Sequence, residues 1–116
     1  MVNYHAQFRQ LLMNATQGVT VYYEAISEKI ATPCISYMEA SNISSANGDT
    51  LSYSEIVYQV KVWAETVDEL LTITQNIDSA LQSNGFTRTN AYETTDDGLL
   101  VKILRYTATG YETNRR

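Results

Sequence analysis

Cysteine, proline and histidine each occur only once in these 116 residues. The single cysteine, Cys34, excludes an internal disulfide and any metal site built from several cysteines, and it fits folding in a reducing cytoplasm. The single proline, Pro33, has no N–H to give to a β-ladder, so we expect it at the start of a strand. The single histidine, His5, has no titrating partner that the sequence places beside it, which favours a packing or surface role over catalysis.

Long apolar runs and an excess of basic residues are also missing. The chain has no run of roughly eighteen apolar residues and no basic N-terminal region followed by an apolar run, so we expect neither a membrane span nor an export signal. Eight Lys and Arg residues stand against thirteen Asp and Glu, which gives a net charge of −5. This balance argues against tight binding to nucleic-acid phosphates.

Motifs that carry chemistry are absent as well. The sequence has no Gly-rich phosphate-binding loop, no G-x-S-x-G and no paired Cys or His motif. Nothing in it indicates a lowered thiol pKa at Cys34, which we interpret as a small buried hydrophobe. The Asp96-Asp97-Gly98 run is typical of a hairpin turn, since a calcium loop would supply more oxygen ligands at regular spacing. We therefore predict a protein that is not an enzyme, with no catalytic residue, metal or cofactor.

The stretch from Leu51 to Phe86 carries the clearest structural pattern. Apolar and polar residues alternate from Ile56 to Ala64, which predicts a strand with one drier face. The pattern changes at Thr66, where T-V-D-E places a helix N-cap three residues before a Glu. An apolar stripe then predicts an amphipathic helix, and Asn84-Gly85 predicts its end. Its members are Val67, Leu70, Leu71, Ile73, Thr74, Ile77, Ala80 and Leu81.

The remaining chain predicts one helix and four further strands around this centre. Asn3 is expected to cap a helix that stops at Gly18. The expected strands cover residues 19–24, 35–40, 86–94 and 99–109. The order α-β-β-β-α-β-β predicts a single α+β domain over residues 1–116, with a largely antiparallel or mixed sheet and two helices packed on one face. We expect a mobile loop at about residues 41–50 and a polar C-terminal tail at residues 110–116.

The strand that begins at Leu51 is longer than the helix that follows it. Fully extended, residues 51–65 would span about 50 Å, whereas the helix covers about 28 Å. Part of the strand would then project as a hairpin arm that meets another subunit. The alternative is a bulge or bend that folds the strand back over its own core. The nine tyrosines, against two phenylalanines, add a second indication, since tyrosine suits a sheet face that a partner covers. For any single tyrosine, ordinary cross-strand pairing is the simpler interpretation.

The layout resembles the tail terminator, or tail completion, proteins of long-tailed bacteriophages and prophages. The resemblance covers nearly the whole chain and rests on G-V-T-V-Y-Y-E, on T-P-C-I-S-Y, on the long strand into T-V-D-E-L-L-T-I-T-Q-N-I-D-S-A-L-Q-S-N-G-F, and on A-Y-E-T-T-D-D-G-L-L-V-K-I-L-R-Y. It implies a virion protein of the tail and neck, assembled in the host bacterial cytoplasm. Such a protein forms a hexameric ring on the head-proximal end of the tail tube, stops tube polymerisation and docks the head connector or stopper protein. DNA would pass through the lumen without specific binding, and an acidic ring would repel its phosphates.

By this resemblance, the interface residues should lie in the polar loop and in the tail. We expect them at Asn42, Ser44, Asn47, Asp49, Tyr53, Tyr111, Arg115 and Arg116. Other neck, head-completion and minor capsid proteins share the size and the acidic balance, and they remain an alternative. A small α/β ligand-binding domain is a further alternative, although the apolar stripes leave no polar gap that would orient a ligand.

Overall fold

The computed structural model of the chain describes residues 3–23, 32–47, 51–96 and 98–113. Two helices and five strands follow one another in the predicted order. They are α1 (His5–Ala15), β1 (Thr20–Tyr23), β2 (Cys34–Asn47), β3 (Leu51–Ala64), α2 (Val67–Gln82), β4 (Thr87–Asp96) and β5 (Leu99–Thr113). The chain therefore has the predicted α+β fold.

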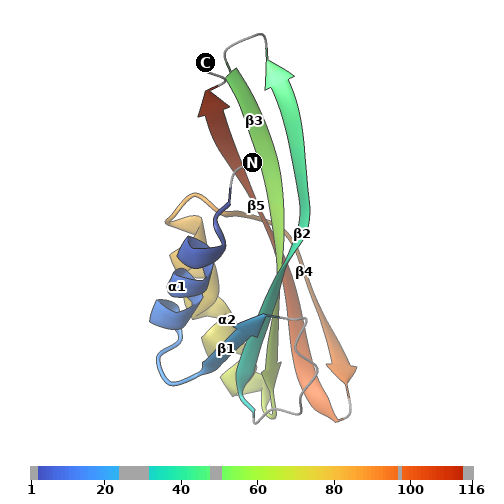
Figure 1. Cartoon of the computed structure of the whole chain (residues 1–116). Helices are drawn as coiled ribbons and strands as arrows, with labels where there is room; N and C mark the ends of the chain where they lie inside the picture. The colour runs from blue at the N-terminus through green and yellow to red at the C-terminus, as the bar shows by residue number, and fades with distance from the viewer. Residues whose placement is uncertain (1–2, 24–31, 48–50, 97, 114–116) are drawn as a thin grey trace.

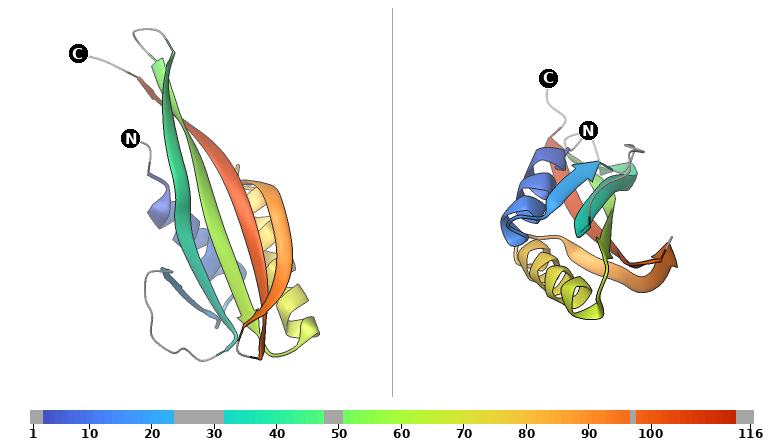
Figure 2. Two further views of the ribbon diagram at one scale, coloured as in Figure 1. Left: turned by 90° about the vertical axis from the view of Figure 1, so that its right-hand side faces the viewer. Right: turned by 90° about the horizontal axis from the view of Figure 1, so that it is seen from below.

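The five strands form one mixed sheet in the order β1-β2-β3-β5-β4. β1 pairs with β2 in parallel, whereas every other neighbouring pair is antiparallel. Figures 1 and 2 show both helices on the same face of this twisted sheet, as the sequence predicted. Among the described residues, the other face of the sheet carries no helix.

The capped helix after β3 forms as predicted. The Thr66 side chain accepts a hydrogen bond from the Glu69 backbone N–H, and the Glu69 carboxylate accepts one from the Glu65 backbone N–H. The first bond satisfies a backbone donor that the helix start leaves without an intrahelical partner, whereas the second reaches Glu65, the residue before the N-cap, and so differs by one residue from a capping box. The predicted stripe is narrower than expected, because Val67 and Leu71 at its margin are 58% and 40% exposed. Its buried members are Leu70, Ile73, Thr74, Ile77 and Leu81.

The core lies between the two helices and the sheet, and aromatic rings fill its centre. The Phe8 ring of α1 stacks on the Tyr58 ring of β3 with a centroid distance of 4.3 Å, and Phe86 meets Phe8 edge-on at 5.1 Å. All three side chains are at most 2% exposed. Contacts of this kind join residues distant in sequence, so they fix how α1 sits on the sheet.

Two segments that the sequence predicted to be irregular are strands. Residues 41–47 belong to β2 and pair with β3, although Ser and Asn in this run favour turns. Gly110–Thr113 belong to β5 and pair with Leu51–Ser54 of β3. Because ladder hydrogen bonds to a long neighbouring strand outweigh local turn preference, the predictions of a loop from 41 and a tail from 110 were wrong over these residues. The rest of the predicted loop and tail, residues 48–50 and 114–116, lies outside the described residues.

Candidate assembly interface

Beyond the helices, β2, β3 and β5 continue as a three-stranded ribbon that we call the arm (residues 43–47, 51–55 and 109–113). Its register runs without interruption from the row Ile43–Glu55–Thr109 to the row Asn47–Leu51–Thr113. Figure 1 shows the arm extending past both α1 and α2. The arm gives the chain its long axis, with extents of 52 × 28 × 23 Å. The predicted projection is therefore present, with a third strand that the sequence did not indicate.

The arm contains most of the predicted interface residues that the structure describes. Ser44 and Asn47 lie on β2, Tyr53 on β3 and Tyr111 on β5, and Tyr53 is the register partner of Tyr111. Asn42 lies at the base of the arm, where it pairs with Ile56. Asp49, Arg115 and Arg116 lie outside the described residues. Segments that are far apart in the sequence thus meet in one ribbon, and their role at an interface stays a prediction.

Both long edges of the arm lack a neighbouring strand among the described residues. β1 covers β2 only along Cys34–Tyr37, so the outer edge of β2 is open from Met38 to Asn47. β4 covers β5 only along Leu99–Thr107, so the outer edge of β5 is open from Ala108 to Thr113. Open edges leave backbone N–H and C=O groups available to another strand. The sequence does not reveal these edges, because strand order cannot be deduced from the alternation within a strand.

A bulge lies at the root of the arm, but in β2 and not in the long strand β3, for which the sequence offered a bulge or bend as the alternative to an arm. The β2 register shifts between Glu39 and Ser41. Glu39 lies beside α1, with its Oε1 3.7 Å from His5 Nε2, and it also accepts a hydrogen bond of 3.5 Å from the Asn42 side-chain amide. Bulges of this kind increase local twist and redirect a strand. The bulge therefore does not replace the arm; it lies where the arm leaves the helix-covered part of the sheet.

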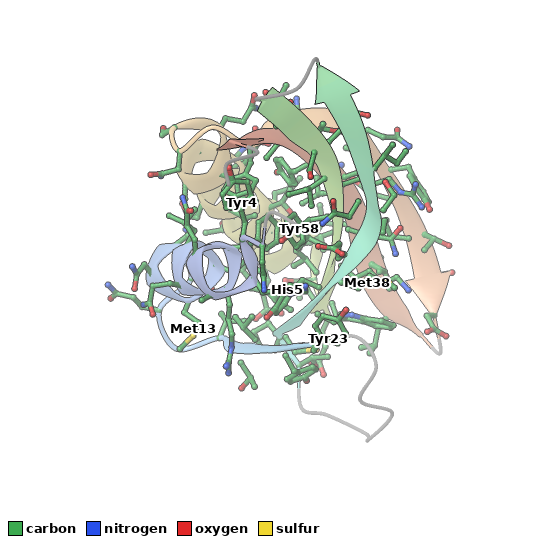
Figure 3. All side chains as sticks on the ribbon, turned by 45° about the horizontal axis from the view of Figure 1, so that its top comes forward. Tyr4, His5, Met13, Tyr23, Met38 and Tyr58 are labelled. Atoms are coloured by element: carbon green, nitrogen blue, oxygen red, sulfur yellow. The ribbon has the colours of Figure 1, made fainter. Side chains whose placement is uncertain are left out.

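His5 packs among aromatic rings, as Figure 3 shows for Tyr23 and Tyr58. Its ring centroid lies 5.6 Å from that of Tyr58, 5.7 Å from that of Tyr23 and 6.4 Å from that of Tyr37. Contacts at these distances, together with Glu39, hold the first turn of α1 against the root of the arm. The packing role predicted for His5 fits this environment.

Cys34 lies on the opposite face of the sheet from α1, so it forms no pair with His5. Its neighbour Ile35 belongs to the helix-covered core, and alternate side chains of a strand face opposite sides. The cysteine is 5% exposed, and burial raises the pKa of its thiol, although the Tyr22 hydroxyl partly offsets this effect. A raised pKa lowers the thiolate fraction on which nucleophilic attack depends. Cys34 therefore packs as a small apolar side chain.

The helix-free face of the sheet is partly apolar. Val101 and Ile103 are only 1% and 8% exposed there, and the Trp63 indole N–H donates a hydrogen bond of 3.5 Å to the Ser36 hydroxyl. Tyr92, opposite Ile103, is 48% exposed. The expectation that some tyrosines stand on this face holds for Tyr92, but two others lie in the core and face the helices. These are Tyr58 and Tyr106, both fully buried.

The acidic groups and hollows found among the described residues differ from those of a typical metal or ligand site. Among residues 3–23, 32–47, 51–96 and 98–113, no group of three or more His, Cys, Asp or Glu side chains could hold a metal ion. Hollows of about 200 and 460 Å³ are open to solvent and lined largely by polar or small residues. A ligand pocket is normally concave, apolar and enclosing. None of the helices in this part of the chain is long and apolar enough to cross a membrane.

The described residues thus form a two-layer α+β domain with a projecting arm whose outer strand edges are open. The profile of the family described as "Tail completion protein gp17" matches residues 9–107. The chain belongs to this family, and it is a structural protein of the bacteriophage tail that associates with other virion proteins. The match covers the arm residues of β2 and β3, but it ends at residue 107, before the arm residues of β5, 109–113.

The fold itself recurs in solved structures, of which 26 chains match. One of them aligns with a TM-score of 0.54 at 16% identity, and the alignment covers 97% of this chain and 92% of that one. At this identity the likeness shows the fold alone. No curated protein matches the sequence.

Proposed function

We propose that this protein caps the head-proximal end of the finished tail tube as a hexameric ring, which ends tube polymerisation and offers a docking surface to the head connector or stopper protein. The observation that carries this proposal is the arm, whose two edges are open and which extends beyond the helices. A strand edge without a partner is a template for pairing with another chain. Membership of the tail completion family supports the phage tail as the place where the protein acts.

Charge supports a passive role toward DNA. The net charge of −5 would repel phosphates from a ring through which the genome passes, so the DNA would slide without being held. The absence of a metal cluster and of an activated thiol among the described residues supports a structural protein over an enzyme. Assembly in the bacterial cytoplasm fits the single buried cysteine.

Electron microscopy of tail tubes mixed with the purified protein tests the proposal. A six-fold ring at one end of each tube, the end that afterwards binds heads, is the expected result. A ring at the opposite end, or particles that never bind tubes, would contradict it. Binding to isolated heads in the absence of tubes would instead support the alternative of a neck or head-completion protein.

A further inference from the structure

The two open edges of the arm lie on opposite sides of the same ribbon and at the same height. Ile43 on β2 and Thr109 on β5 are both register neighbours of Glu55 on β3. A second copy that is rotated about an axis along the arm would bring its β2 edge beside the β5 edge of the first. Because each copy offers one edge of each kind, the contact is heterologous, and a heterologous contact closes into a ring when the rotation permits.

The sequence along the β2 edge lacks the features that usually prevent edge pairing. Residues 40–47 read A-S-N-I-S-S-A-N, with no charged side chain and no proline. The β4 edge differs, since it carries the charged residues Arg88, Glu93 and Asp96. A register shift does not distinguish the two edges, because β4 has one between Arg88 and Asn90 and β2 has one between Glu39 and Ser41, below the arm. Natural sheets use charges and bulges to blunt edges that must stay single. The β4 edge is therefore protected, and the β2 edge is left available.

The arm on its own is also poorly covered, which favours association with another chain. It consists of three strands that extend past α1 and α2, and Ile43 in its first row is 59% exposed. A sheet of so few strands needs a hydrophobic face, or a helix packed against it, to be stable on its own in water. Pairing on both sides would remove both edges of every arm at once, which only a closed ring of strands achieves.

We infer that the arms of neighbouring copies pair edge to edge, β2 of one copy against β5 of the next, to form a closed β-barrel that lines the ring. This inference rests on the hexameric ring proposed above. β2 and β5 both run antiparallel to β3, so the seam between copies is parallel. Six arms of three strands would make a barrel of eighteen strands. Barrels of about that number leave an aqueous channel, and a strand spacing of about 4.8 Å with a tilt of about 40° sets opposite backbones roughly 35 Å apart.

Cysteine cross-linking between copies tests this seam directly. We would use a Cys34→Ala chain that carries Ile43→Cys and Thr109→Cys, in rings bound to tail tubes, with a short thiol-specific cross-linker. A second pair, Ile43→Cys with Tyr111→Cys, allows for a stagger of two residues, which keeps both thiols on the same face of the sheet. The expected result is a ladder of covalent species that ends at six chains for at least one of the two pairs. Chains with only one of the new cysteines are the matched controls and should stay monomeric.

The possible outcomes distinguish failure of the inferred seam from failure of the proposed capping ring. Rings at tube ends without cross-links for either pair would overturn the β2 to β5 seam while leaving the capping function intact. Cross-linked dimers from Ile43→Cys alone would show that two β2 edges meet, which also contradicts the inference. If the folded variants and the parent protein both fail to form rings on tubes, the seam and the proposed function fall together. Thermal melts identify any variant that does not fold.

Discussion

Tyrosine hydroxyls connect the core of this protein to its polar groups. The Tyr106 hydroxyl donates a hydrogen bond of 2.7 Å to Asp78 of α2, whose other carboxylate oxygen lies 3.0 Å from the Arg88 guanidinium. Burial, followed by the bond to Asp78, raises the pKa of Tyr106. Burial also raises the pKa of Tyr58 to about 12, and the nearby Glu39 carboxylate adds to this effect. The folded state thus favours the neutral phenol at both positions.

These raised pKa values predict a loss of stability at alkaline pH. The unfolded phenols titrate near pH 10, so the stabilisation is fully present below that pH and is lost as the pH rises toward the folded values. Above pH 10 each such tyrosine should lower the free energy of unfolding by up to about 1.4 kcal/mol per pH unit. Denaturant melts between pH 8 and 11 measure this slope. Tyr106→Phe should reduce it, and a free energy that stays constant up to pH 11 would contradict the assignment.

Replacing the only histidine and the only cysteine tests the non-enzymatic interpretation. His5→Ala and Cys34→Ala should both support phage assembly wherever stability is retained, because the two side chains lie on opposite sides of the sheet and neither has a catalytic partner. A complementation assay on phage yield, with thermal melts beside it, makes the measurement. Loss of infectious particles at parental stability for either variant would argue for a chemical role.

At the scale of elements, α2 buries more residues than α1 does, with five against two. Leu70 and Ile77 are at most 1% exposed against the sheet. Leu70→Ala or Ile77→Ala should lower the free energy of unfolding by about 2 to 5 kcal/mol, because each leaves a cavity in a packed core. Gln75→Ala, on the exposed side of the same helix, is the matched control and should change it by less than about 0.5 kcal/mol. Equal effects at all three positions in denaturant melts would show that the stripe is not the core.

The elements with strong local signals were the ones that the sequence could predict. The T-V-D-E cap, the apolar stripe that follows it and the alternation from Ile56 to Ala64 depend on neighbours along the chain, so both α2 and β3 were anticipated. The projection of β3 was anticipated as well, but the strands beside it, Ser41–Asn47 and Gly110–Thr113, were not, because they carry turn-forming or polar residues and become strands only through β3. The local propensity of a residue does not predict pairing with strands that are distant in the sequence. The open edges escaped prediction for the same reason.

At the scale of the whole molecule, the arm should be the part whose dynamics change on assembly. Backbone amides in residues 43–47 and 109–113 should exchange with solvent quickly in the free protein, because no strand of the described chain covers the arm's outer edges. They should exchange slowly in rings bound to tail tubes. Amides of Val60 and Leu104, in the middle of the sheet, are the internal control and should be slow in both states. Equal protection of the arm with and without tubes would place the interface elsewhere.

Capping of the tail tube is the central claim, and the length of tubes grown in its presence tests it most directly. Tube protein would be polymerised with no addition, with the parent protein, and with a variant that lacks residues 44–48 in the arm, and tube lengths and ends would be scored by electron microscopy. The parent protein should halt growth and leave a ring at one end, while the deletion variant, if it keeps the folded core, should leave the length distribution as it is without addition. Tubes that grow to the same lengths and end without rings when the folded parent protein is present would contradict the account.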